Sequence, residues 1–153
     1  MAYQWKSAIS SSLRGSKILP AGFFSQAGKS IRITARGWVS ASGANRQITP
    51  KLYLGAVEIW NGGMVELDAA DSGPYSLDAL VNCYSTGATG TVRTSARMLA
   101  DLATGGLLWW QDGTEPANIT IDTTSALTLD WGVYAAPEMI HFTTTHFYWE
   151  SLD

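Results

Sequence analysis

The chain has 153 residues and a mass of 16.5 kDa, a size that supports one hydrophobic core. Its residues are 46% hydrophobic and only 15% charged, with abundant Gly, Thr, Ser and Trp, which excludes a chain that is disordered throughout and favours short strands joined by tight turns. The net charge of -3, the pI near 5.2 and the total of ten Lys and Arg argue against nucleic-acid binding.

The N-terminal segment is polar and basic, with hydrophobic side chains scattered at positions such as Trp5, Ile9 and Leu13. We interpret residues 1–17 as an extended arm beside a globular domain of residues 18–153. Because Ile9 and Leu13 would also share one face of a helix, a short helix is the alternative. The segment lacks the apolar core of a secretory signal, and no stretch of the chain is apolar enough for a membrane helix. We therefore expect assembly in the cytoplasm and no membrane partner.

From residue 18 onward, apolar and polar residues alternate in short runs, which is the pattern of β-strands. The clearest run, Lys29 to Ser40, places one set of side chains inward and another outward. The inward set is Ile31, Ile33, Ala35, Gly37 and Val39, and the outward set is Arg32, Thr34, Arg36 and Trp38. Similar runs follow at 48–60, 74–84, 91–100, 119–121, 127–133 and 139–150, separated by turns rich in Gly, Asn and Asp. About eight to ten short strands predict an all-β protein, a single jelly-roll-like antiparallel β-sandwich.

Cysteine and histidine are too sparse to indicate a disulfide or a metal site. Cys83 is the only cysteine, so no internal disulfide can form, and the alternation over residues 75–83 predicts a buried thiol that packs as a small hydrophobe. His141 and His146 are the only histidines. Their odd separation on a strand predicts opposite faces, which argues against one shared metal site.

Motifs for catalysis or cofactor binding are also missing from the sequence. Residues 28–30 read Gly-Lys-Ser like the end of a phosphate-binding loop, but a strand pattern follows instead of the helix that would bind phosphate. Asp68 and Asp71 lie in a loop without the spacing of a calcium-binding motif. No pair of carboxylates stands out as general acid and base. We expect a protein that is not an enzyme and has no cofactor.

The charges are divided unevenly along the chain. Residues 1–57 contain eight Lys or Arg and no acid, whereas residues 58–153 contain all thirteen acids and only two arginines. In one interpretation the fold interleaves early and late strands, so the charges mix in space. In the other, the basic first part of the chain docks on an acidic partner while the acidic second part forms a surface that faces solvent.

The chain has seven tryptophans, which in a protein of this size can supply either core volume or a binding surface. Trp38 falls on the outer phase of its strand, and because Trp109 and Trp110 are adjacent, one of them must point away from the core if they lie on a strand. The run Phe147-Tyr148-Trp149 likewise places aromatic rings on both faces. Either oligomer contacts or a loop cover these rings, or the rings stack on carbohydrate.

Several short motifs carry a family resemblance. Pro20-Ala21-Gly22 is followed by Gly28-Lys29, by an alternating strand that ends in Ala35-Arg36-Gly37, and by the strand Leu52-Tyr53-Leu54-Gly55; near the end, Asp122-Thr123-Thr124 forms a turn before a Thr-rich last strand. Over roughly residues 18–151 this pattern resembles the jelly-roll structural proteins of bacteriophage virions. The resemblance implies a jelly-roll module that decorates capsids, builds head fibres or belongs to the tail, often as a trimer.

Our leading hypothesis is a capsid decoration (cement) or head-fibre protein located on the virion. It would form a homotrimer that binds the major capsid protein, or another virion protein, and stabilises the shell. The predicted partner-binding residues are Trp5, Lys6, Ile9, Arg14, Lys17, Trp109 and Trp110. The alternative is a tail-fibre or receptor-binding module that recognises host surface glycans through exposed aromatic rings. A third alternative is a glycan depolymerase, against which the small size and the lack of a nameable acid–base pair argue.

Overall fold

The computed structural model describes residues 4–7, 17–43, 46–103, 106–111, 117–136 and 140–152. These ranges contain twelve strands and no helix, so the all-β prediction is confirmed. They accordingly hold no helix that could cross a membrane. The strands are β1 (Gln4–Ser7), β2 (Lys17–Leu19), β3 (Ser30–Ala41), β4 (Arg46–Leu54), β5 (Val57–Asn61), β6 (Val65–Leu67), β7 (Ser72–Ser85), β8 (Gly90–Leu102), β9 (Gly106–Gln111), β10 (Ile119–Ile121), β11 (Leu127–Ala136) and β12 (Ile140–Ser151).

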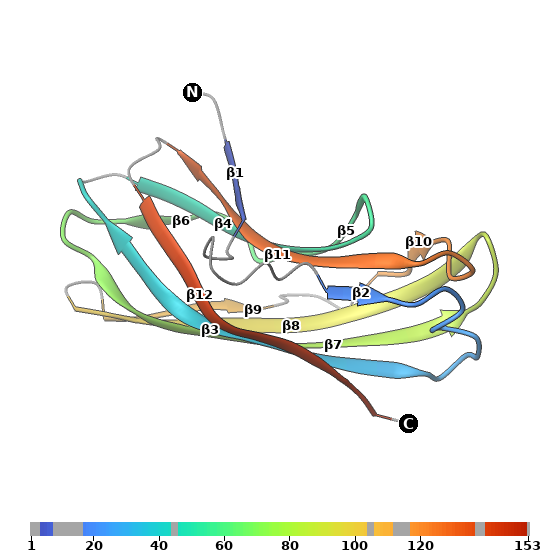
Figure 1. Cartoon of the computed structure of the whole chain (residues 1–153). Coiled ribbons are helices and arrows are strands. Elements are labelled where there is room, and N and C mark those ends of the chain that lie inside the picture. The colour runs from blue at the N-terminus through green and yellow to red at the C-terminus, as the bar shows by residue number, and fades with distance from the viewer. Residues whose placement is uncertain are drawn as a thin grey trace.

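The strands form two antiparallel sheets that pack face to face (Figure 1). Sheet A, the upper layer in Figure 1, has the order β1-β11-β4-β5, with β2 also paired to β11 and β6 to β4. Sheet B, whose long strands β3, β7 and β8 form the lower layer in Figure 1, has the order β10-β8-β7-β3-β12, with β9 also paired to β8. The molecule is therefore a β-sandwich, as the alternating sequence predicts.

Strands from the two ends of the domain pair with each other. β3 pairs with β12 in sheet B, and β4 pairs with β11 in sheet A, so two successive early strands lie beside two successive late strands. This nested pairing joins the beginning and the end of the domain in both sheets. β7 and β8, which form a hairpin, lie on the other side of β3 and give the order β12-β3-β7-β8, in which the last strand lies beside the first.

The segment predicted as an arm contributes strands to sheet A. β1 and β2 both pair antiparallel with β11. Trp5 of β1 lies opposite Tyr134 of β11, and Lys17 of β2 lies opposite Leu129 of β11. Residues 1–3 and 8–16, the remaining part of the predicted arm, lie outside the described residues.

The core lies between the sheets and follows the two-residue period of the strands. Every second residue of β7 from Gly73 to Cys83 is buried, and the same holds for β8 from Gly90 to Leu102. Cys83 is 1% exposed, which confirms the prediction of a buried thiol. Alternation places one face of each strand against the opposite sheet, where burial of its apolar side chains stabilises the sandwich.

An aromatic cluster with an internal hydrogen-bond chain fills part of this core. The Tyr75 hydroxyl lies 2.6 Å from Thr144 Oγ1 and accepts a hydrogen bond from Trp131 Nε1 at 3.3 Å. The Phe142 ring stacks on the Tyr75 ring with centroids 4.5 Å apart. Burial raises the pKa of Tyr75 to about 12, and the two hydrogen bonds oppose only part of that rise. The cluster ties β7 and β12 of sheet B to β11 of sheet A.

A β-bulge interrupts β12 between Thr144 and His146. It lies opposite Gly37, where a Cβ atom would stand 1.8 Å from the Thr143 carbonyl oxygen, so only glycine allows β3 and β12 to approach this closely. Because the bulge adds one residue to the strand, it shifts the alternation of the side chains by one position. His141 and His146 are both exposed as a result, and the prediction that they lie on opposite faces is wrong.

Candidate functional site

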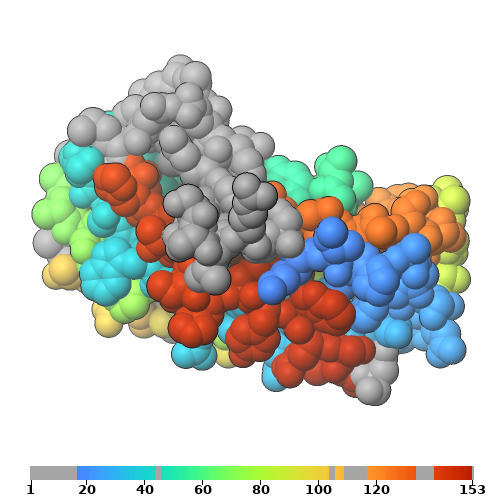
Figure 2. Space-filling view, viewed as in Figure 1, coloured from blue at the N-terminus to red at the C-terminus, as the bar shows by residue number. Residues whose placement is uncertain are grey.

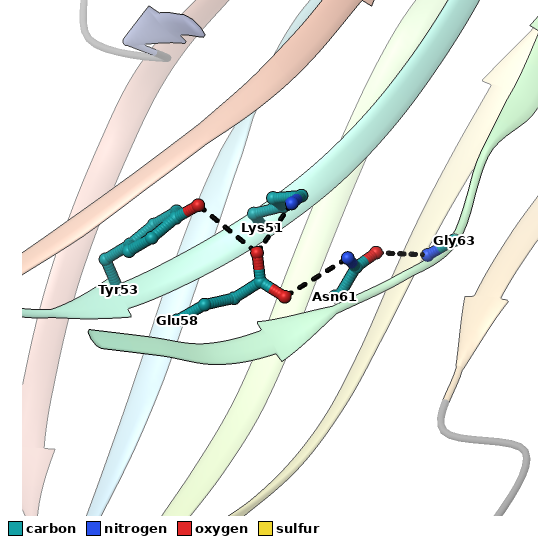
Figure 3. A network of polar contacts seen from close by, with 5 residues as sticks. All are labelled: Lys51, Tyr53, Glu58, Asn61 and Gly63. Atoms are coloured by element: carbon teal, nitrogen blue, oxygen red, sulfur yellow. Dashed lines mark hydrogen bonds and ion pairs between the residues drawn. The ribbon is translucent and has the colours of Figure 1, made fainter. Parts of the chain in front are cut away.

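The outer face of sheet A carries a hydrogen-bond network around Glu58 (Figure 3). Lys51 Nζ lies 2.5 Å from Glu58 Oε2, and the Tyr53 hydroxyl donates to the same oxygen at 3.2 Å. Asn61 Nδ2 donates to Glu58 Oε1 at 3.1 Å, and Asn61 Oδ1 accepts from the Gly63 backbone N–H at 3.0 Å. Both carboxylate oxygens of Glu58 therefore have donors.

Local chain geometry brings these side chains together. Gly55 adopts a left-handed backbone with φ 64° in the tight turn between β4 and β5, a conformation that favours glycine. Tyr53 and Glu58 are opposite each other directly after this turn, and the register shift beyond them sets Asn61 opposite Lys51. Burial alone would raise the pKa of Glu58, but the hydrogen bonds from Lys51, Asn61 and Tyr53 and the charge of Lys51 together hold it below its usual value. The ionised carboxylate of Glu58, with hydrogen-bond donors on both oxygens, stabilises the β4–β5 hairpin. Because it is held in the ionised form, it is poorly suited to act as a general acid.

The positive and negative parts of the chain mix in space within the described residues. β3, from the basic part, lies between β7 and β12 of the acidic part, and β4 lies between β11 and β5. Arg32 NH1 lies 3.6 Å from Glu150 Oε1, and Lys51 pairs with Glu58. Of the two interpretations of the charge asymmetry, mixing is the one that holds, and the described surface is not divided into a basic and an acidic half.

The outward-pointing residues of sheet B form rows across its four long strands, which we call the sheet B outer face. The first row is Glu150, Arg32, Leu80 and Ser95; the second is Tyr148, Thr34, Asp78 and Arg97; the third is His146, Arg36, Ser76 and Leu99. Trp38 follows on β3 and is 49% exposed, and Tyr148 is 50% exposed. This face therefore combines arginines, carboxylates and exposed aromatic rings.

A shallow hollow of about 410 Å³ lies on this face. It is lined by Arg32 of β3, Asp78 and Leu80 of β7, Ser95 and Arg97 of β8, and Leu152 after β12. A second hollow of about 250 Å³ is lined by Ser76, Asp78, Arg97 and Leu99. Because Asp78 and Arg97 line both hollows, these two side chains are at the centre of the recessed surface.

Asp78 and Arg97 are directly opposite each other on neighbouring strands. Within the described part of the chain, neither side chain takes part in an ion pair or a side-chain hydrogen bond. Arg32 differs, because it pairs with Glu150. The hollow thus presents one acceptor and one planar donor whose hydrogen-bonding capacity is open to a ligand.

The residues predicted to bind partners lie on other strands. Trp5 and Lys6 belong to β1, and the exposed Lys17 begins β2, so these three positions share one edge of sheet A beside β11. Trp109 and Trp110 belong to β9 in sheet B, opposite Leu99 and Met98 of β8. Ile9 and Arg14 lie outside the described residues. The structure therefore places the predicted residues on two separate sheets and does not bring them into one site.

The other side chains that could react or bind a metal ion are dispersed or buried. Burial raises the pKa of the Cys83 thiol, whose Sγ donates to the Ser85 carbonyl oxygen at 3.3 Å. Among the described residues, no three His, Cys, Asp or Glu side chains are grouped so that they could hold a metal ion. Comparison with known proteins gave no match to a protein-family model, a curated protein or a solved structure.

Proposed function

We propose that this chain is a structural protein of a bacteriophage virion, a capsid decoration or head-fibre protein that forms homotrimers and binds the major capsid protein or another virion protein. The observation that carries the proposal is the nested pairing of β3 with β12 and of β4 with β11, because this is the strand arrangement that the resemblance implies. Gly22, Gly28 and Gly55 of the resembling motifs adopt left-handed backbones in turns. Their positions are consistent with motifs that encode the turns of this fold.

Exposed apolar side chains support self-association. Burying such side chains between copies would remove apolar surface from water, which is the main favourable term in most protein association. Among the residues whose burial the structure describes, the large hydrophobic ones that are about half exposed or more are Ile18, Trp38, Met64, Tyr84, Leu107, Tyr148 and Leu152.

The edge of β12 offers a second means of association. This strand has 12 residues, pairs with β3 on one side, and has no other partner among the described strands. In the space-filling view its atoms, coloured red, lie at the front surface of the molecule (Figure 2). An edge strand exposes backbone donors and acceptors that can pair with a strand of another copy.

Two measurements test the proposal. Light scattering on the purified protein should give about three times the 16.5 kDa mass of one chain. Mass spectrometry and immunogold labelling of virions from a host that carries this sequence should locate the protein on the particle. A monomer at all concentrations would contradict the homotrimer, and absence of the protein from purified particles would overturn the virion assignment.

Point substitutions test the capsid contact better than deletion of residues 1–17. Deletion would also remove β1 and uncover the edge of β11, which could destabilise sheet A. The substitutions Trp5→Ala and Lys6→Ala should lower capsid occupancy, while Glu66→Ala, an exposed position on β6, serves as control. Equal occupancy for all three variants would exclude a role of β1 in binding.

A further inference from the structure

The arginines of this chain are concentrated on the sheet B outer face. Four of its six arginines, namely Arg32, Arg36, Arg93 and Arg97, project from β3 and β8. Arg93 is occupied, because its guanidinium lies 4.3 Å from the Tyr84 ring centroid and its Nε donates to Asn118 at 2.7 Å. Arg97, by contrast, has no such partner within the described ranges, and it lines the hollow. A planar guanidinium recognises a carboxylate through two parallel hydrogen bonds, so this position suits an acidic group.

The carboxylates on the same face restrict which acidic ligand can bind. Asp78 lies in the hollow opposite Arg97, and Glu150 flanks Arg32. A polymer with a phosphate on every unit would meet these two carboxylates and be repelled. A saccharide instead carries many hydroxyl donors for each acidic group. Its hydroxyls can donate to Asp78, and Ser95 can exchange hydrogen bonds with them.

Apolar surface completes the arrangement. Leu80 and Leu152 line the hollow, and the half-exposed Tyr148 lies in the same row as Asp78, with Thr34 between them. The C–H face of a sugar ring packs on an aromatic face because the ring quadrupole is negative there. The hollow of about 410 Å³ falls within the range of roughly 300–1,000 Å³ that small-ligand sites occupy.

We infer that the sheet B outer face binds an acidic saccharide, with Arg97 holding the carboxylate, Asp78 accepting from sugar hydroxyls and Tyr148 packing against a neighbouring ring. The proposed site takes its contacts from β7, β8 and β12 and assigns none to Trp109 or Trp110, which lie on β9 beside β8. It does not depend on a virion location, because it follows from the side chains of β3, β7, β8 and β12 alone.

An oligosaccharide array tests the inference. The array holds sialylated, uronate-containing and neutral oligosaccharides, together with a single-stranded DNA oligonucleotide as a phosphate polymer. Binding should be restricted to carboxylate-bearing sugars and should disappear when their carboxylates are methyl-esterified. Arg97→Ala and Asp78→Asn should each weaken binding of the best acidic sugar at least about tenfold, or about 1.4 kcal/mol. Arg93→Ala, which removes the same charge from the same strand outside the hollow, should bind as the unmodified protein does.

Several outcomes would overturn the inference. These are equal binding of neutral sugars, equal binding of DNA, no binding to any sugar on the array, or an Arg93→Ala loss as large as that of Arg97→Ala. Thermal unfolding of each variant shows that it is folded, and Arg97→Lys, which keeps the charge but loses the two-pronged donor, should bind in an intermediate way. Because particle location is measured separately, failure here leaves the test of the virion proposal unaffected.

Discussion

Replacing Tyr75 by Phe removes one oxygen atom from the interior of the sandwich. Tyr75 is 3% exposed, and its hydroxyl is the partner of Thr144 Oγ1 and of Trp131 Nε1, both of which are also buried. The substitution leaves these two groups without that partner and creates almost no cavity. A buried polar group that loses its partner costs roughly 1–3 kcal/mol, so we expect the free energy of unfolding to fall by roughly 2–4 kcal/mol.

Urea and thermal unfolding followed by tryptophan fluorescence measure this loss. For a domain of this size the expected decrease corresponds to a midpoint lowered by roughly 5–15 °C. The double variant Tyr75→Phe/Thr144→Val removes both ends of the shorter hydrogen bond and should lose less than the sum of the two single variants. A Tyr75→Phe variant within about 0.5 kcal/mol of the original protein would refute the hydrogen-bond chain, since surface substitutions have effects of that size.

The same variant changes the response to alkaline pH. Because the pKa of Tyr75 is about 12 in the folded protein against a usual value of 10.0, the neutral hydroxyl stabilises the fold fully below pH 10. This contribution is lost as the pH rises through about 12. Between these values the stability of Tyr75→Phe should fall less steeply with pH than that of the original protein. Parallel slopes would show that Tyr75 does not carry the shift.

Two substitutions and one reactivity measurement test the Glu58 network, the Cys83 thiol and the β12 bulge. Glu58→Gln should lower the free energy of unfolding by less than about 1 kcal/mol, because the carboxylate is partly exposed. The difference from the original protein should vanish as the pH falls from 4.5 through the lowered folded-state pKa of Glu58. A difference that persists in acid would contradict the stabilising role of the carboxylate. Cys83 should react with a thiol reagent at least about tenfold more slowly in the native protein than in urea, since burial raises its pKa; equal rates would exclude burial. Gly37→Ala should cost about 2 kcal/mol or more in denaturant unfolding, because its Cβ would overlap the Thr143 carbonyl oxygen; a neutral result would mean that β12 can move away from β3.

The burial pattern of the long strands could be predicted because it depends on a local rule, the alternation of side chains between the two faces of a strand, which we call parity. In a strand, successive side chains point to opposite faces, so one inward residue determines the others. The inward placement of Ile31 and Val39, the outward placement of Trp38 and the burial of Cys83 followed from this rule and are confirmed. The rule also placed Thr34 on the outer face, yet its side chain is buried, in the row between Tyr148 and Asp78.

Parity failed where a distant segment changes the strand. His141 and His146 were predicted on opposite faces, but the β12 bulge lies between them. The bulge forms opposite Gly37, which is more than a hundred residues away in sequence, and the hydroxyls of Thr143 and Thr145 donate to carbonyl oxygens of β3 around it. No local pattern in the last strand contains this information. For the same reason the sequence left both interpretations of the charge asymmetry open, because the choice between them depends on which strands become neighbours.

The proposed saccharide site depends on register as well as on parity. Parity alone assigns Arg32 to an outer face, but it does not pair Asp78 with Arg97. That pairing depends on the turn between β7 and β8, and a slip of two residues would keep every side chain on its face while setting Ser76 or Leu80 opposite Arg97. The turn is fixed from outside the hairpin, since the Gly87 backbone N–H donates to Thr123 Oγ1 at 2.8 Å and the Thr123 N–H donates to the Gly87 carbonyl oxygen at 3.1 Å. The chemistry of the hollow is therefore set partly by a threonine that belongs to a different loop and lies far from the hollow along the strands.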